Sequence, residues 1–333
     1  MPIQIASVPA LLAVLLCAGL FVLLFQYLFP RPAPWKLAGV ALVAGIVATL
    51  VLSLVLHHFV APGLAGLDGL TSISAALPFA ILRAGLPEEA TKALAAIMAL
   101  LPFWRRATPA QAFQASLFAA VGFAVVENQG YASVFGDYAV LIAFGRGFLA
   151  TLTHTLLAMI FGGFLMRFVA SGWRSWHLLL IGYLVAAGCH ALYDAGLLPI
   201  LAEYLNAQNT SEKIDVEALS VVVITASPFI IGGIALVLIG GLWSLRRSIQ
   251  RAALDEPIVA EPSHQAIVRR WRYCANGLLV LGILGFIGGI AWAILDESPQ
   301  ADPADMHRAL VILVVIAAGL FAMIASWVVR QKR

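Results

Sequence analysis

The sequence predicts an all-α, polytopic membrane protein, a transmembrane helical bundle of about nine spans. Of its 333 residues, 62% are hydrophobic and only 11% are charged, whereas soluble domains carry about 25% charged residues. The apolar residues form long runs without the alternation that is typical of strands. We therefore expect the lipid bilayer as the surroundings of the chain, and no nucleic acid among its partners.

Nine apolar runs approach or exceed the roughly twenty residues that a helix needs to cross a bilayer. They cover residues 4–29, 36–59, 73–104, 110–128, 138–168, 177–201, 217–244, 274–295 and 308–329. The first run has no Lys or Arg before it and exceeds the apolar part of a signal peptide, so we expect it to stay attached. In the third run, which contains Pro78 and Pro87, we expect a short interfacial helix followed by a span that begins near Pro87.

The connections between these runs alternate in charge along the chain. The basic set comprises Arg31, Lys36, Arg105, Arg106, Arg167, Arg174, the segment 245–272 and the tail 330–333. The acidic set comprises Asp68, Asp137 and the loops 203–217 and 296–305. By the positive-inside rule the basic set is cytoplasmic, which predicts an N-terminus outside and a cytoplasmic C-terminus.

The intramembrane polar residues divide the chain into two predicted parts. Residues 1–210 contain almost all of them and form the expected membrane-embedded functional core. Residues 211–333 form an expected additional transmembrane segment, with a basic cytoplasmic linker at 245–272.

Ionisable residues within four apolar runs are the strongest functional signal, because a charge near the bilayer centre costs roughly 2.5–3.5 kcal/mol. The third run holds Glu88, Glu89 and Lys92. Lys92 follows Glu88 by one helical turn, while Glu89 points about 100° away. The next three runs contribute Glu127 and Asn128, then Arg146 and His154, then His190 and Asp194, the last two again one turn apart.

These residues share one depth. At a helical rise of 1.5 Å per residue, the acidic pair lies roughly 25 Å from Arg105, and Glu127 lies roughly 28 Å from Thr108. His154 lies roughly 20 Å from Arg167, and His190 lies roughly 20 Å from His177. Four helices therefore place ionisable groups in one layer, in the outer half of the bilayer.

This combination suits hydrolysis of an amide bond. Two adjacent glutamates perturb each other, so one can act as general base toward a water molecule, while Lys92, Arg146 or a neutral histidine stabilises the oxyanion. The predicted catalytic residues are Glu88, Glu89, His190, Glu127 and His154, supported by Lys92, Asn128, Arg146 and Asp194. No cofactor is firmly implied, but a divalent metal such as zinc could be held by Glu89, Glu127, His154 and His190.

The order of these motifs resembles a known family. The EExxK pattern at 88–92 is similar to the first motif of the PrsW-type glutamic intramembrane proteases, distant relatives of the CAAX-processing and bacteriocin-related membrane proteases, which carry EExxxR. The FxxxEN pattern at 123–128, an arginine before a histidine in the next run, and HxxxD at 190–194 match its later motifs. The resemblance covers about residues 75–200. It implies a protease in the bacterial cytoplasmic membrane whose substrate is a membrane-anchored protein, in the namesake branch an anti-sigma factor cut on its extracytoplasmic side.

Three classes of function fit the residues themselves. The first, which we expect, is a membrane-embedded endopeptidase. The second is a proton-coupled transporter or relay, since buried Glu, His and Asp also serve pumps, although the sequence lacks the internal repeat of many transporters. The third is a non-catalytic membrane scaffold in which the polar residues hold helices together.

Overall fold

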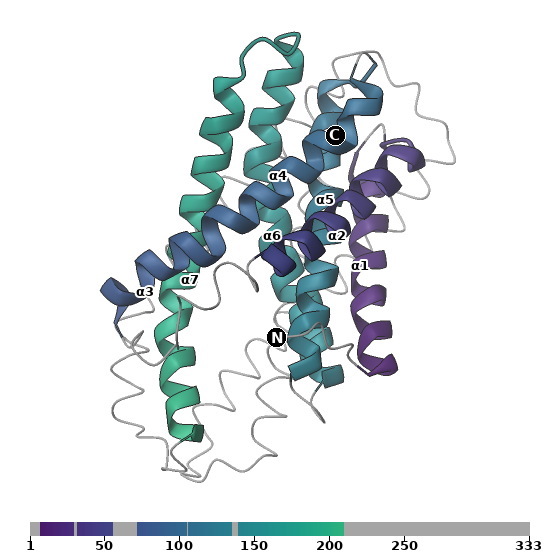
Figure 1. Cartoon of the computed structure of the whole chain (residues 1–333). Helices are drawn as coiled ribbons and strands as arrows, with labels where there is room; N and C mark the ends of the chain where they lie inside the picture. Colours follow the sequence, from purple (N-terminus) through teal and green to yellow (C-terminus); the bar gives the residue numbers. More distant parts are fainter. Residues whose placement is uncertain (1–6, 30–31, 56–71, 105, 135–138, 210–333) are drawn as a thin grey trace, which may run out of the picture. The chain divides into compact units, whose positions relative to one another are not determined.

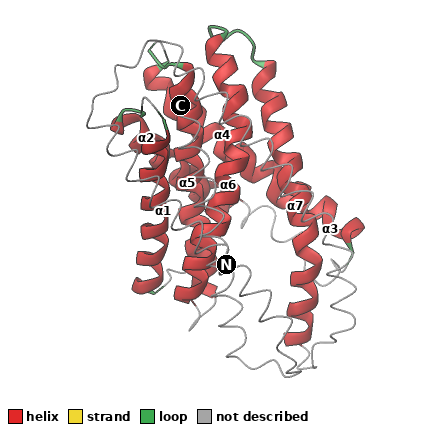
Figure 2. Cartoon of the chain, turned by 180° about the vertical axis from the view of Figure 1, so that it is seen from behind, coloured by secondary structure: helices red, strands yellow, loops and turns green. Residues whose placement is uncertain are grey.

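The computed structural model describes residues 7–29, 32–55, 72–104, 106–134 and 139–209, most of which lie in helices (Figures 1 and 2). No strand occurs among these residues, so the all-α prediction is confirmed for this part of the chain. The elements are α1 (Val8–Leu28), α2 (Trp35–Val55), α3 (Ile73–Ala80), η3 (Ile81–Gly85), α4 (Leu86–Leu100), η4 (Leu101–Phe103), α5 (Pro109–Val134), α6 (Ala139–Ala170) and α7 (His177–Asn209). The predicted spans at 217–244, 274–295 and 308–329 and the linker at 245–272 lie outside the described residues.

Five helices in the described ranges are long and apolar enough to cross a membrane. The qualifying segments are Val8–Tyr27, Trp35–Leu54, Pro109–Ser133, Ala139–Ala170 and His177–Gly196. The count of nine spans stays a prediction. Two helices exceed their predicted ends at 128 and 201, because the backbone continues as a helix through polar residues beyond the apolar run, to Val134 and Asn209.

The third apolar run is a series of helical segments rather than one regular helix. α4 begins at Leu86, near the predicted start at Pro87, but it has only 15 residues and is not among the five described helices that can cross a membrane, so a span in this run stays a prediction. Ahead of it, η3 is a π-helical turn over Ile81–Gly85. A proline cannot donate a hydrogen bond to the carbonyl four residues earlier, and its ring crowds that carbonyl. The carbonyl in question belongs to Arg83, so the wider turn lies where the ordinary helical ladder would be interrupted.

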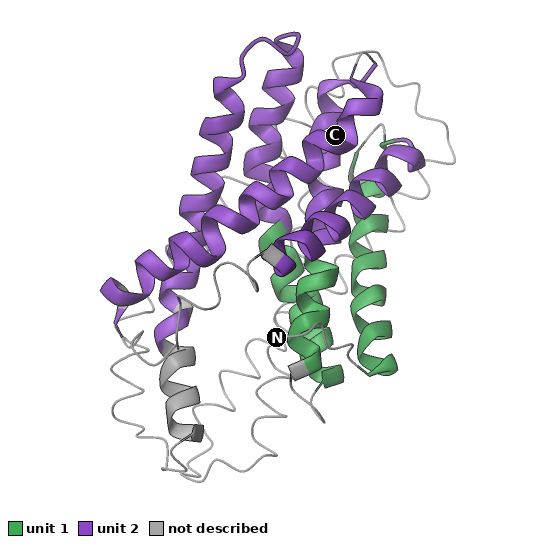
Figure 3. Ribbon diagram, viewed as in Figure 1, with its two compact units in different colours: residues 1–33, 124–154, 249–333 green, residues 34–123, 155–248 purple. Residues whose placement is uncertain are grey.

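The chain divides into two compact units (Figure 3). Unit 1 comprises residues 1–33, 124–154 and 249–333, and unit 2 comprises 34–123 and 155–248, so α5 and α6 each contribute residues to both. Within unit 1, small side chains of α1, α5 and α6 form a shared core. Its buried members are Ala10, Ala13, Val14, Ala132, Ala139 and Ala143.

In unit 2, α4 packs against both α2 and α7, while α3 and η3 pack along α7. Glycines allow α2 and the first half of α5 to approach closely. A Cβ added at Gly45 would overlap the carbonyl of Ala119, and one added at Gly122 would overlap the carbonyl of Leu42. Small residues are common where transmembrane helices cross, because they let the backbones touch.

Two connections at one end of unit 2 have well-defined local geometry. Before α5, Thr108 and Gln111 form a reciprocal capping box: each side-chain oxygen accepts a hydrogen bond from the other's backbone N–H, at 3.2 and 3.0 Å. Between α6 and α7, both Gly172 and Trp173 adopt the left-handed conformation, with φ of 68° and 66°. For a bulky residue such as Trp173 this conformation costs roughly 1–2 kcal/mol.

Candidate active site

Within each compact unit, several of the predicted site residues lie close together. The unit 2 cluster consists of Glu88, Glu89, Lys92, His190 and Asp194, from α4 and α7. The unit 1 cluster consists of Glu127, Asn128, Arg146 and His154, from α5 and α6.

A close approach between η3 and α7 positions the unit 2 cluster. Gly85 lies immediately before α4, and a Cβ added there would lie 2.6 Å from the carbonyl oxygen of Ala187 and 3.0 Å from the Cβ of Ala191. Because these two residues flank His190 on α7, the contact holds His190 beside the first turn of α4, which carries both glutamates.

Glu89 is the buried centre of the unit 2 cluster, with only 2% of its surface exposed. Its Oε1 accepts a hydrogen bond from Lys92 Nζ at 2.5 Å and lies 2.9 Å from His190 Nδ1. Lys92 is itself buried, with Nζ 4.6 Å from the centroid of the Phe123 ring. The sequence spacing associated Lys92 with Glu88 and turned Glu89 away, whereas the ion pair is with Glu89, because side chains three apart on a helix are also neighbours.

His190 connects all three carboxylates of the unit 2 cluster. Its Nδ1 faces Glu89, while Nε2 lies 3.7 Å from Glu88 Oε2 and 3.4 Å from Asp194 Oδ2. The side chains of Glu88 and Asp194 are 17% and 21% exposed, so this side of the imidazole is less enclosed than the Glu89 side, although Glu88 Oε2 is itself buried. The structure thus places Asp194 beside His190, as their i,i+4 spacing predicts.

One pair of donor atoms, His190 Nε2 and Asp194 Oδ2, has a separation suited to two ligands of one small divalent cation. Ligand atoms of a tetrahedral zinc site lie roughly 3.3–3.5 Å apart, since each bond is about 2.0–2.1 Å long. The 3.4 Å between His190 Nε2 and Asp194 Oδ2 matches this spacing. On the other nitrogen, Glu89 fixes the ring through Nδ1, the arrangement that commonly orients a metal-binding histidine.

In the unit 1 cluster, Glu127 is held between two side chains of α6. One carboxylate oxygen accepts a hydrogen bond from Arg146 at 2.9 Å, and the other lies 2.5 Å from His154 Nε2. The Arg146 guanidinium also lies over the ring of Tyr131, 3.5 Å from its centroid. His154 is buried, whereas 30% of the Arg146 side chain is exposed. Both carboxylate oxygens are therefore engaged by cationic or imidazole groups.

Asn128 links the same two helices. It is buried, and its side-chain amide donates a hydrogen bond to Thr151 Oγ1 at 3.1 Å. A support role for Asn128 stays a prediction, and this contact shows what it would support: the pairing of α5 with α6 next to Glu127.

Sequence reasoning missed two side chains that brace the backbone around the acidic pair. The Thr91 hydroxyl donates to the Pro87 carbonyl at 2.7 Å, and the Tyr183 hydroxyl donates to the Leu86 carbonyl at 3.1 Å. The first contact has a local signal, because a threonine four residues after a proline can bond back to it. The second joins residues 97 positions apart and has no such signal.

Comparison with known proteins identifies the family of the chain. Residues 33–231, more than half of the chain, match a family model described as "PrsW family intramembrane metalloprotease". No similarity to a curated protein or to a solved structure was found. With helices that can cross a membrane and a match of this length, the chain belongs to the PrsW family of intramembrane metalloproteases and is an integral membrane peptidase.

Proposed function

We propose that this peptidase hydrolyses a peptide bond of a membrane-anchored protein with a water molecule activated by a glutamate of the unit 2 cluster. The observation that carries the proposal is the arrangement around His190. One ring nitrogen is fixed by a buried, ion-paired Glu89, and the other faces the more accessible Glu88. Because the chain belongs to a family of intramembrane proteases, we favour a peptidase over a transporter or a scaffold.

In this proposal the two adjacent glutamates have different roles. Glu88 is the general base, because its side chain is less enclosed than that of Glu89, with 17% of it exposed. It takes the proton of the attacking water and returns it to the leaving nitrogen. Glu89 is 2% exposed and engaged by Lys92 and His190, so it orients the imidazole rather than reacting.

Substitution of Glu88 by glutamine tests the base role with little change in shape. General acid–base catalysis contributes about 10²–10⁴-fold, so Glu88→Gln should lower kcat by at least about a hundredfold. The substrate would first be found by comparing membrane-anchored proteins in cells that carry the wild type or this variant. Cleavage would then be measured in proteoliposomes. Full activity of Glu88→Gln would refute the proposal.

The residues that we propose as ligands of a divalent metal lie in the same unit 2 cluster. A bound divalent metal would polarise the scissile carbonyl and acidify water. Of the sequence-predicted ligands, His190 fits this role, whereas Glu89 Oε1 already faces Lys92 and His190 Nδ1. We propose that His190 Nε2 and Asp194 Oδ2 bind the metal and that Glu88 stays the base. Glu127 and His154, the remaining predicted ligands, engage each other directly in unit 1.

Metal analysis of purified variants separates ligand from base. His190→Ala and Asp194→Ala should lose the bound metal, while Glu88→Gln should keep it and lose activity. His177→Ala serves as the matched control, because His177 is an exposed histidine on the same helix. Equal metal loss in Glu88→Gln would make Glu88 a ligand, and a metal-free, active wild type would exclude a catalytic metal.

Topology and substrate identity complete the proposal. We propose a protein of the bacterial cytoplasmic membrane with nine spans, N-terminus outside and C-terminus cytoplasmic, and a division into residues 1–210 and 211–333. An anti-sigma factor cut on its extracytoplasmic side is the candidate substrate. Reporter fusions after residue 175 and after residue 207 should report opposite sides of the membrane, and the same side for both would contradict this topology.

A further inference from the structure

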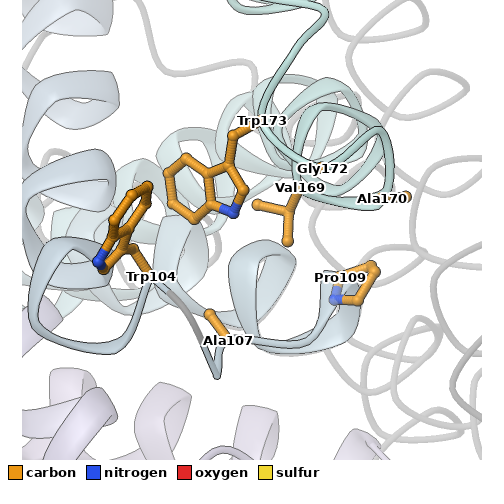
Figure 4. A pocket seen from close by; sticks show the side chains of 7 residues that line it. All are labelled: Trp104, Ala107, Pro109, Val169, Ala170, Gly172 and Trp173. Carbon is orange, nitrogen blue, oxygen red and sulfur yellow. The ribbon is translucent and has the colours of Figure 1, made fainter.

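A cavity of about 510 Å³ lies in unit 2, away from the unit 2 cluster in sequence, between two connections (Figure 4). One wall comes from the segment after η4 and the start of α5, with Trp104 and Pro109, and the other from the end of α6 and the turn after it, with Val169 and Trp173. The two indole rings lie side by side toward one end, with centroids 6.0 Å apart and planes at 79°. Apolar and aromatic groups therefore supply much of the lining.

This cavity belongs to a membrane surface. α6 and α7 are both candidate spans, and the connection between them, residues 171–176, is not helical throughout. Irregular backbone is not stable in contact with hydrocarbon, so this connection lies at the level of the lipid headgroups or beyond. Tryptophan is enriched at that level, and half-exposed Trp104 fits it.

The two connections that line the cavity carry basic residues and no acidic ones. Arg106 and Arg174 are exposed and adjoin lining residues in sequence, and Arg167 lies one turn before the end of α6. In the sequence, no Asp or Glu occurs between Glu89 and Glu127 or between Asp137 and Asp194. Neither connection therefore contains an acidic side chain that could neutralise these arginines.

Trp173 is held in an unfavourable backbone conformation that points its ring at the cavity. Its φ is +66°, and its indole packs edge-on against both Trp104 and Phe168. Glycine or asparagine would adopt this conformation more easily. We infer that packing of the ring, and not the backbone preference of tryptophan, accounts for a tryptophan at this position.

We propose that this cavity binds an anionic phospholipid of the adjacent leaflet. Arg106 and Arg174 contact the headgroup phosphate, and the first carbons of an acyl chain lie against Trp104, Val169 and Trp173. The combination of two exposed arginines with an apolar, aromatic wall matches a ligand with an anionic head and a hydrocarbon tail.

Native mass spectrometry of the purified full-length protein in detergent tests the site directly. With added phosphatidylglycerol we expect a retained lipid adduct, at least about fivefold more abundant than with phosphatidylcholine, since each basic residue near a headgroup contributes about this factor. Arg106→Gln combined with Arg174→Gln should remove the preference for the anionic lipid. Trp173→Gly should weaken retention of both lipids while relieving the backbone.

Trp176→Ala is the matched control, because Trp176 is an exposed tryptophan of the same turn that does not line the cavity. Retention by this variant should equal that of the wild type. Equal retention of both lipids by the wild type, or equal loss in Trp176→Ala and Trp173→Gly, would overturn the proposal. Displacement of the lipid by soluble glycerol phosphate at comparable concentration would also overturn it, because the site would then recognise phosphate without a chain.

Discussion

Replacement of Gly85 by alanine should separate the acidic pair from His190. The added Cβ would lie 2.6 Å from the Ala187 carbonyl oxygen, whereas carbon–oxygen contacts between helices are ordinarily about 3.3–3.6 Å. The η3–α7 contact therefore has to open by roughly 0.7 Å. Backbone atoms of α7 and the Cβ of Ala191 form the opposing surface, so no flexible side chain can absorb the change.

A shift of this size is expected to affect catalysis more than folding. Misplacement of reacting groups by about 1 Å can cost a hundredfold in rate, so Gly85→Ala should lower kcat by about 10- to 100-fold. Overpacking costs about 1–3 kcal/mol, and alanine recovers up to about 1 kcal/mol because it favours a helix more than glycine does. The net loss of stability should therefore be about 0–2 kcal/mol.

The assay is cleavage of the identified substrate in proteoliposomes, with thermal unfolding measured on the same preparations. Gly188→Ala is the control, since Gly188 lies on α7 and a Cβ added there meets nothing within 4 Å. Gly188→Ala should keep wild-type activity. Wild-type kcat in Gly85→Ala would refute the reasoning, because the close η3–α7 contact would then not position the acidic pair beside His190.

Three further substitutions test single contacts of the clusters. Lys92→Met should destabilise the protein by about 3–5 kcal/mol in thermal unfolding, because it leaves a buried carboxylate without its cation. Adding Glu89→Gln to this variant should restore most of the lost stability. Equal stability of the single and double variants would contradict the ion pair. Tyr183→Phe should lower kcat while KM stays constant, and it should lower the free energy of unfolding by about 0.5–1.5 kcal/mol, because one hydrogen bond is lost beside the acidic pair. An unchanged kcat would exclude this bracing role. Thr151→Val should lower the free energy of unfolding by about 1–3 kcal/mol, because it leaves the Asn128 amide without its acceptor. Thr151→Ser keeps a hydroxyl and should not have this effect. Identical melting temperatures for the two variants would argue against the hydrogen bond.

The helices were predictable because an apolar run of twenty residues has few alternatives in a membrane. The ends of α5 and α7 were less so, since helical hydrogen bonding continues past the apolar stretch that the sequence reveals. The π-helical turn at η3 could not be read from the sequence: Pro87 marks a disturbance of the helix, but the response depends on how closely Gly85 approaches α7.

The residues of the candidate site were easier to predict than their partners. A charge in an apolar run stands out on its own, which is why Glu88, Glu89 and His190 could be selected. Which carboxylate Lys92 contacts depends on His190 from another helix, and spacing along one helix did not resolve it. The role of Tyr183 could not be predicted for the same reason, because it depends on a hydrogen bond from its hydroxyl to a carbonyl of another helix.

The reciprocal glycines of α2 and α5 have a consequence for how sequence variation accumulates in this protein. Gly45 faces the backbone of α5 and Gly122 faces the backbone of α2 at the same crossing. A first Gly→Ala change at either position must push the helices apart, and a second change then meets space already opened. Because neighbouring sites are not additive, the pair should show strong positive epistasis. Substitution of either glycine should therefore be unfavourable while both are present. After one has been substituted, substitution of the other should cost less stability.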